Sequence, residues 1–274
     1  MQVMMATKGD NLAHPRRDHD DAPAVRIAMW SGPRNISTAM MRSWGSRADT
    51  VVCDEPLYAR WLKATGTDHP GATETIAACD TSLDRIIAWL TREPMPAGKR
   101  VFYQKHMAHH VLADDDLAWT EALKNCFLIR DPALVIASYT KIAPNPTARD
   151  LGLPQQLALF TRERERLGVS PPVLDADEAL RDPATALRAL CGRVDVEFDD
   201  AMLSWAPGPR TTDGVWGKHW YASVHKTTGF GPPRGASPAL AARLTPLLRQ
   251  CEPMYRALRE EHMFVGGVST GNGD

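Results

Sequence analysis

Basic and hydroxyl residues directly follow the first apolar run of the chain. Residues 25–30 are expected to form a strand, and an apolar helical pattern runs on to about residue 44. The loop between them contains Gly32, Pro33, Arg34, Asn35, Ser37 and Thr38. The first N–H groups of a helix lack intrahelical partners and the helix dipole is positive there, so an oxyanion is stabilised. Arginine and hydroxyl donors would add to this. The segment predicts an anion-binding loop; an ordinary βα turn with a serine cap is the alternative.

A second basic residue follows another apolar run. Residues 124–129 are expected to form a strand that Arg130 and Asp131 close, and Pro132 is suited to the first position of a helix. Ser138 comes two turns into that helix, from where it can face back toward Arg130. The pair predicts a second anion contact, with an Arg–Asp surface pair as the alternative.

Two candidates for acid–base chemistry also follow expected strands. Glu55 comes after residues 50–53, and Lys105 and His106 come after residues 100–104. A histidine with a pKa near neutrality suits general-base catalysis, and a carboxylate can play the same part. Lys105 is a candidate for contacting a leaving oxygen. The alternatives are a helix-start acid for Glu55 and a core histidine for His106.

Three histidines lie close together at His106, His109 and His110. Their spacing could supply two metal ligands, but no cysteine or carboxylate stands at the spacing of the known zinc signatures. We therefore predict no metal site.

The elements that must position these residues alternate between strands and helices. Expected strands at 25–30, 50–53, 100–104, 124–129 and 172–174 are separated by helical patterns. This order predicts an α/β three-layer sandwich with a mostly parallel central sheet, in which ligands bind beyond the carboxyl ends of the strands. We expect a single domain over residues 25–265, with a loose extension over 1–24 and a loose tail over 266–274.

The overall charge limits the classes of partner. The 274 residues include 32 Lys and Arg and 33 Asp and Glu, so the formal net charge is −1. This balance argues against a nucleic-acid partner. The five cysteines are scattered without a CxxC pair, which favours a reducing, cytoplasmic setting. No apolar run reaches the roughly 18 residues of a membrane span. The sequence predicts no particular oligomeric state.

The two basic segments resemble motifs of the PAPS-dependent sulfotransferases. Residues 33–38 (PRNIST) resemble their 5′-phosphosulfate loop, commonly Pro-Lys/Arg-Ser-Gly-Thr/Ser-Thr, although Ile36 replaces the usual glycine. Residues 126–138 resemble the 3′-phosphate motif, in which Arg130 and Ser138 would hold that phosphate.

The resemblance implies a P-loop NTPase-like fold and a reaction. PAPS, 3′-phosphoadenosine 5′-phosphosulfate, would give its sulfuryl group to a hydroxyl or amine of a small-molecule or carbohydrate acceptor and leave adenosine 3′,5′-bisphosphate. His106 falls where cytosolic-type members carry their catalytic histidine, whereas Glu55 resembles the Glu-Pro-Leu element of carbohydrate-type members, so both remain candidates for the base. Lys218 stands near the place of a late Arg-Lys-Gly segment, whose order is missing here.

Two other functions remain open at this point. A kinase-like phosphotransferase would use ATP and magnesium, with Asp131 holding the metal, but Asn35-Ile36 stands where GxxxxGK[ST] requires Gly-Lys. A non-catalytic nucleotide-binding protein of the same fold is the other, favoured by Ile36 and by the missing Arg-Lys-Gly.

Overall fold

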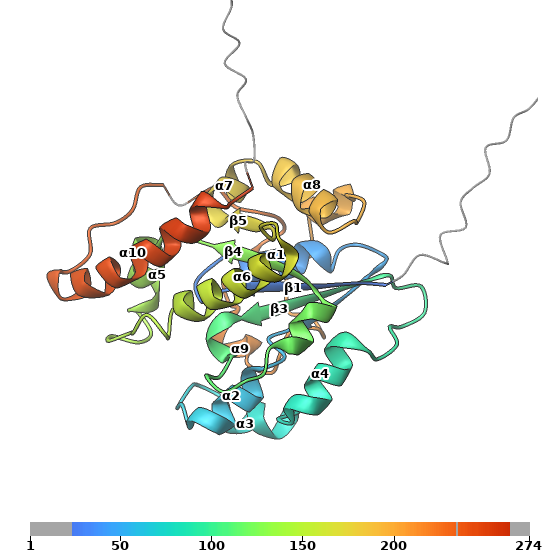
Figure 1. Cartoon of the computed structure of the whole chain (residues 1–274), viewed down its shortest axis with the longest axis horizontal. Helices are drawn as coiled ribbons and strands as arrows, with labels where there is room; N and C mark the ends of the chain where they lie inside the picture. The colour runs from blue at the N-terminus through green and yellow to red at the C-terminus, as the bar shows by residue number, and fades with distance from the viewer. Residues whose placement is uncertain (1–23, 234, 264–274) are drawn as a thin grey trace, which may run out of the picture.

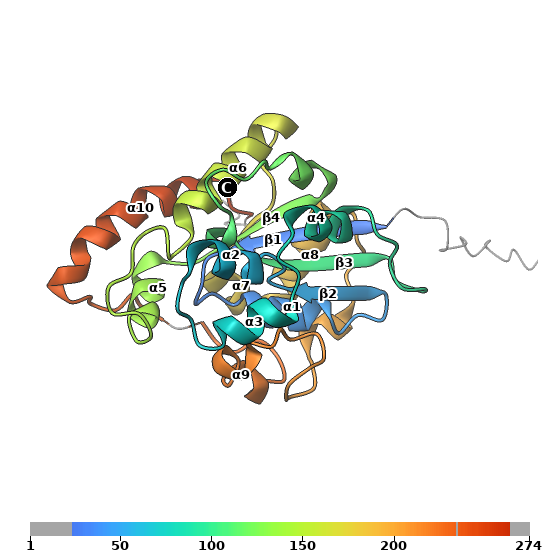
Figure 2. The same cartoon turned by 90° about the horizontal axis from the view of Figure 1, so that it is seen from below.

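Five parallel strands form the single sheet of the computed structural model, which describes residues 24–233 and 235–263. The strands are β1 (Val25–Ser31), β2 (Thr50–Asp54), β3 (Val101–Met107), β4 (Lys124–Ile129) and β5 (Val173–Asp175). Their order is β2-β3-β1-β4-β5; Figure 1 labels all of these strands except β2, which Figure 2 labels. The predicted α/β class and parallel sheet are confirmed. Apart from Ala24, the expected extension and tail lie outside the described residues.

Helices cover both faces of this sheet, as Figure 2 shows from a second side. The helices are α1 (Ser37–Trp44), α2 (Tyr58–Thr65), α3 (Ala72–Ala78), α4 (Leu83–Thr91), α5 (Pro132–Tyr139), α6 (Leu153–Leu167), α7 (Ala176–Arg181), α8 (Pro183–Arg193), α9 (Gly217–Trp220) and α10 (Thr245–Glu260). One buried cluster joins a sheet face to α1, α7 and α8, and another joins the opposite face to α4, α5, α6 and α10. The predicted three layers are therefore present.

Strand alternation decides which side chains reach which layer. Ile27 and Met29 of β1 pack in the α1 layer, whereas Ala28 and Trp30 pack in the opposite layer. Strand β3 runs to Met107, three residues beyond its expected end. Lys105 and His106 therefore lie within the strand, where consecutive side chains point to opposite faces of the sheet.

A third buried cluster lies near the carboxyl ends of the strands. Tyr58, Trp61 and Leu62 of α2 pack there with Trp216 and Tyr221 from the segment around α9. The Tyr58 and Trp216 rings meet edge to face with centroids 5.1 Å apart. This packing brings a late part of the chain against residues that directly follow β2.

Candidate active site

A cavity of about 820 Å³ opens where the loops after β1, β2 and β4 meet, at the edge of the sheet where the sequence predicts ligand binding. The predicted site residues that line it are Pro33, Arg34, Asn35, Ser37, Thr38, Glu55, Lys105, Arg130 and Ser138. Gly32, His106 and Lys218 do not line it.

The loop after β1 is held by specific backbone contacts. A Cβ atom at Gly32 would lie 2.4 Å from the Leu151 carbonyl oxygen, so only glycine allows this close approach. Asn35 Nδ2 donates to the Leu128 carbonyl at 3.0 Å, and its Oδ1 accepts from the Ile36 N–H at 2.8 Å. These contacts fix the loop against the end of β4.

The backbone of this loop accommodates isoleucine at the usual glycine position. Ile36 has φ −89°, and the left-handed conformation falls on Arg34 instead, with φ 59°. Helix α1 begins at Ser37 without a side-chain cap. Its first-turn N–H groups are therefore available to an anion in the cavity, to which Ser37 and Thr38 present hydroxyl groups.

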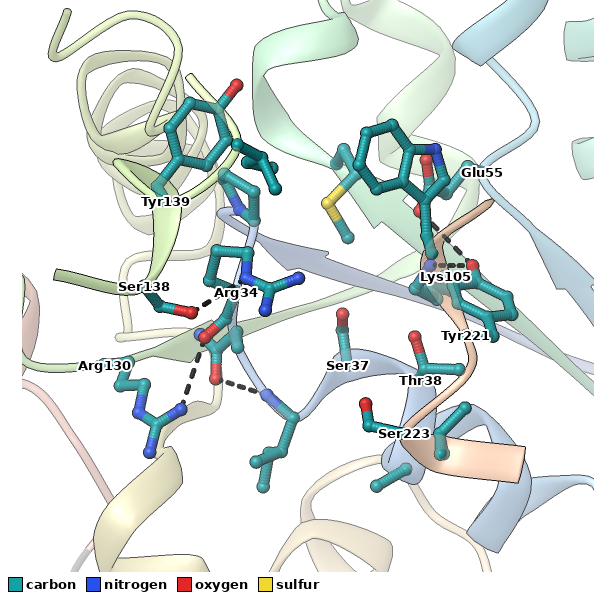
Figure 3. Close-up of a pocket in the computed structure, with 18 of the residues that line it drawn as sticks. Arg34, Ser37, Thr38, Glu55, Lys105, Arg130, Ser138, Tyr139, Tyr221 and Ser223 are labelled. Carbon is teal, nitrogen blue, oxygen red and sulfur yellow. Dashed lines mark hydrogen bonds and ion pairs between the residues drawn. The ribbon is translucent and has the colours of Figure 1, made fainter. Parts of the chain in front are cut away.

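The two predicted anion motifs meet on one wall of the cavity (Figure 3). Arg34 Nε donates to Ser138 Oγ at 2.9 Å, and Arg130 Nη1 donates to the Arg34 carbonyl at 3.3 Å. Arg130 is also paired with Asp177 at 3.1 Å. Its buried Nε has no hydrogen-bond partner within the described residues. A buried donor of this kind is costly unless a ligand satisfies it.

Asp131, the magnesium candidate of the kinase interpretation, caps helix α5 instead. Its Oδ1 accepts from the Ala133 N–H at 2.7 Å, and its Oδ2 accepts from Ser237 Oγ. It does not line the cavity. No group of three or more His, Cys, Asp or Glu within residues 24–233 and 235–263 is arranged to hold a metal ion.

A buried lysine lies across the cavity from the arginine wall, with Ser37 and Thr38 between (Figure 3). Lys105 Nζ contacts Asp54 Oδ1 at 2.8 Å, Glu55 Oε1 at 2.5 Å and the Tyr221 hydroxyl at 2.8 Å. Burial opposes its charged form, but Asp54 and Glu55 outweigh this and raise the Lys105 pKa. Burial also raises the pKa of Glu55, against the opposing effect of Lys105. Lys105 therefore stays protonated, and Glu55 is a stronger base than an exposed glutamate.

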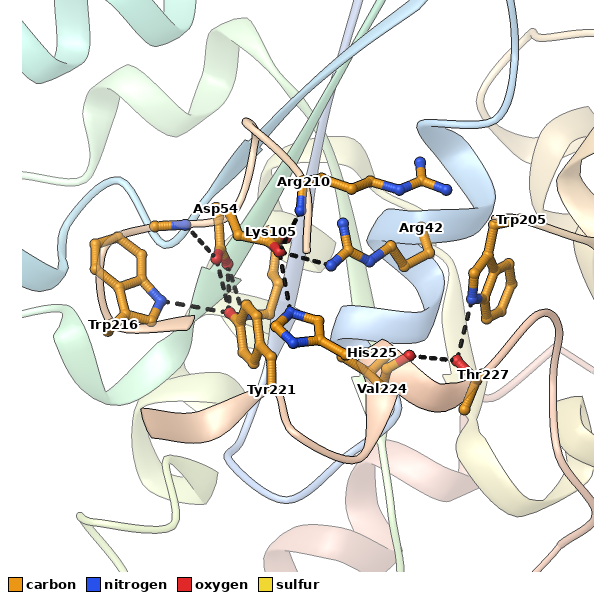
Figure 4. A network of polar contacts seen from close by, with 12 residues as sticks. Arg42, Asp54, Lys105, Trp205, Arg210, Trp216, Tyr221, Val224, His225 and Thr227 are labelled. Atoms are coloured by element: carbon orange, nitrogen blue, oxygen red, sulfur yellow. Dashed lines mark hydrogen bonds and ion pairs between the residues drawn. The ribbon is translucent and has the colours of Figure 1, made fainter. Parts of the chain in front are cut away.

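Tyr221 joins the late segment of the chain to this cluster (Figure 4). Its hydroxyl lies 2.7 Å and 2.9 Å from the two Asp54 carboxylate oxygens, and the Gly214 N–H donates to Asp54 at 3.1 Å. Nearby, Asp213 accepts from buried Arg42 at 2.7 Å. The segment is thus fixed to the end of β2 and to α1. Tyr221 cannot be predicted from local sequence patterns, because 116 residues separate it from Lys105.

His106 lies in the core rather than at the cavity. It is 1% exposed, its ring stacks on Trp30 with centroids 4.2 Å apart, and its Nε2 lies 3.1 Å from Gln104 Oε1. Burial lowers its pKa to about 3. It points to the face opposite Lys105, because β3 continues past the expected end. The geometry does not bring His106 to the cavity, whereas Glu55 lines it.

Lys218 also lies apart from the cavity lining. Its side chain is exposed and pairs with Glu74 on α3. The structure therefore does not bring it to the proposed nucleotide site, although it follows Trp216 in the segment that does reach the cavity.

The match to a family of known proteins agrees with this geometry. The model of the family described as "sulfotransferase domain" matches residues 25–262. The chain belongs to this sulfotransferase family.

Two curated relatives and two solved structures are similar to this sulfotransferase chain. Branched-chain-amino-acid aminotransferase-like proteins 1 and 2 of Arabidopsis thaliana are 36% and 35% identical over 85% of the chain. The chain spans about two fifths of the length of the curated relatives it matches, 41% of each.

The solved structures share the fold. The sulfotransferase domain of the Synechococcus PCC 7002 olefin synthase has a TM-score of 0.50 at 17% identity, over 84% of this chain and 96% of that one. A sulfotransferase from Alicyclobacillus acidocaldarius has a TM-score of 0.50 at 11% identity, over 88% and 98%. The sulfotransferase fold that the resemblance implied is confirmed. None of the helices described in this chain is long and apolar enough to cross a membrane.

Proposed function

We propose that this chain transfers a sulfuryl group from PAPS to a hydroxyl or amine of a small-molecule or sugar acceptor. The observation that carries the proposal is the convergence of Arg34, Ser138 and Arg130 on one cavity that also holds Glu55 and Lys105. Family membership supplies the reaction class. The five cysteines are free thiols, which supports a cytoplasmic setting, and we propose residues 25–265 as one domain.

The donor groups of the cavity suit a nucleoside with anionic groups at two positions. The first turn of α1, Ser37 and Thr38 would hold the 5′ group, and Arg130 with Ser138 would hold the 3′-phosphate. The unpartnered Nε of Arg130 gives one specific donor for that phosphate. Arg34, which donates to Ser138, would link the two halves of the site.

Glu55 is the proposed base. The acceptor oxygen bonds to sulfur as the bond between sulfur and the 5′-phosphate oxygen breaks, and the electron pair stays on that phosphate. Glu55 takes the proton of the acceptor hydroxyl. Lys105, held 2.5 Å from Glu55, keeps a positive charge next to the reacting groups. The donors of the loop after β1 stabilise the negative charge on the leaving phosphate.

Calorimetry on the full chain tests the nucleotide assignment. Adenosine 3′,5′-bisphosphate should bind in the micromolar range or tighter, and ATP with magnesium should bind far more weakly. Tight binding of ATP with magnesium and no binding of the bisphosphate would contradict the proposal and favour a phosphotransferase. Transfer of radiolabelled sulfuryl groups from PAPS to pooled small alcohols then tests catalysis, and a lack of any labelled product would favour a non-catalytic binding protein.

A further inference from the structure

Part of the cavity is lined by aromatic and polar residues other than those proposed to bind the nucleotide. We define the acceptor chamber by six lining residues: Glu55, Tyr58, His69, His109, Tyr139 and Asp150. The Tyr58 hydroxyl lies 3.0 Å from His69 Nδ1, and Tyr58 stacks on His110 with centroids 4.8 Å apart. The chamber thus combines aromatic rings with polar groups next to the proposed base.

Carboxylates dominate the charge of this chamber. Asp150 accepts from the Thr147 N–H and hydroxyl at 2.8 Å, and Asp68 also lines the cavity. Asp68 is exposed and Asp150 is half-buried, so both carboxylates are accessible from the cavity. Both lie close enough to His69 to oppose the burial that lowers its pKa.

The cations that line the cavity are paired with other acids or lie on the nucleotide side. Lys105 is paired with Asp54 and Glu55, Arg130 is paired with Asp177, and Arg34 donates to Ser138 on the nucleotide side. Burial lowers the pKa of His109 to about 3 and that of His110 well below its usual value, so both rings are neutral near pH 7. The chamber is therefore net negative.

Two buried ring nitrogens in the cavity wall lack partners. His109 and His110 are 7% and 1% exposed, and the Nδ1 atom of each has no hydrogen-bond partner within residues 24–233 and 235–263. Neutral imidazole can donate or accept at this atom. A polar ligand group in the chamber would satisfy such atoms, which are costly to leave unpaired.

We infer that the acceptor is an alcohol that carries a protonated amine on an apolar or aromatic body, and that anionic alcohols are rejected. This inference rests on the proposed function. Carboxylates attract an ammonium group directly. A carboxylate or sulfate on the acceptor would meet the like charges of Asp68, Asp150 and Glu55.

Three matched probes test the charge preference. Phenylalaninol, 3-phenyl-1-propanol and tropate each carry a phenyl ring and a primary alcohol, and are respectively cationic, neutral and anionic at pH 7. Their affinities are measured by calorimetry on the full chain, with and without saturating adenosine 3′,5′-bisphosphate. Phenylalaninol should bind about tenfold tighter than 3-phenyl-1-propanol, and tropate should bind most weakly.

Asparagine variants test whether the preference for a cationic probe arises from the carboxylates that line the cavity. Asp150→Asn and Asp68→Asn should each weaken phenylalaninol binding about fivefold and leave 3-phenyl-1-propanol unchanged. Asp114→Asn removes the same charge from an exposed residue outside the cavity lining and should change neither affinity.

The outcomes separate this inference from the proposed function. Tropate binding as tightly as phenylalaninol, no measurable phenylalaninol binding, or a charge preference that survives both variants would overturn the inference. Failure of the bisphosphate to bind would contradict the proposed function instead, because the probes are also measured without it.

Discussion

Arg130 and Arg34, 96 residues apart in the sequence, are joined by a hydrogen bond from the Arg130 guanidinium to the Arg34 carbonyl at 3.3 Å. The bond ties the end of β4 to the loop after β1 and fixes the spacing between two positive groups. Because Arg34 also donates to Ser138, the two loops and helix α5 form one rigid wall. Such preorganisation lowers the entropic cost of binding a nucleotide.

Glu55→Gln tests the proposed base. The substitution preserves size and some hydrogen bonding but cannot take a proton, so turnover should fall about 100-fold or more. The affinity for adenosine 3′,5′-bisphosphate should stay close to that of the unmodified chain. Steady-state kinetics and calorimetry measure the two effects. Equal losses of turnover and affinity would point to a structural role for Glu55.

The pH dependence of turnover distinguishes the two candidate bases. Burial raises the pKa of Glu55 above its usual 4.5, whereas burial lowers that of His106 to about 3. A base must be unprotonated, so activity is lost as the pH falls through its pKa. We expect the acid limb of kcat, at saturating donor, to have its midpoint above 4.5. A limb that extends down to about 3 would instead implicate His106.

His106→Phe tests the core assignment of this histidine. The new ring can still stack on Trp30, but Gln104 Oε1 loses its partner. The free energy of unfolding should fall by at most about 1–2 kcal/mol, the usual cost of an unsatisfied buried acceptor, because the change also removes the buried His106 Nδ1, which has no partner among the described residues. Denaturant titration measures this, and kcat of the folded protein should stay within about threefold, whereas loss of a base costs about 100-fold. A large drop in kcat would refute the assignment.

Tyr221→Phe tests the link between the late segment and the site. The variant keeps the ring but removes the hydroxyl between Lys105 and Asp54, and should lower the free energy of unfolding by about 2 kcal/mol. Tyr103→Phe is the matched control, because the buried Tyr103 hydroxyl has no partner among the described residues. It should leave stability unchanged or raise it, because it removes a buried polar group that lacks a partner. Equal effects of both substitutions in thermal or denaturant unfolding would argue against a specific role for the Tyr221 hydroxyl.

Short-range sequence patterns predict much of the fold and of the candidate site. Each of the five strands and the helices after β1 and β4 has a local signal. Gly32, Arg34, Asn35 and Arg130 follow strands as predicted, and Ser138 lies in helix α5 as predicted. Family resemblance then related the two anion motifs to a single ligand. The prediction of a three-layer parallel fold was correct because alternating strand and helix patterns leave few other arrangements.

The remaining features depend on contacts that local patterns do not encode. The local pattern predicts that β3 ends at residue 104. In the structure its pairing with β1 and β2 continues past that residue, so His106 lies within the strand and points into the core. Tyr221 reaches Lys105 only through the packing of the α9 segment on α2. Helix α6 was not predicted, although it contributes Leu159 and Phe160 to the core.

Whether Arg130 holds the 3′-phosphate is tested most directly with two ligands that differ by that one phosphate. Arg130→Ala should weaken binding of adenosine 3′,5′-bisphosphate by about 2 kcal/mol, roughly 30-fold, and leave the affinity for adenosine 5′-monophosphate nearly unchanged. Arg162→Ala, which removes a half-buried ion-paired arginine outside the cavity lining, is the control and should alter neither. Equal losses for both ligands, or no loss for either, in calorimetry on the folded variant would contradict the claim that Arg130 holds the 3′-phosphate.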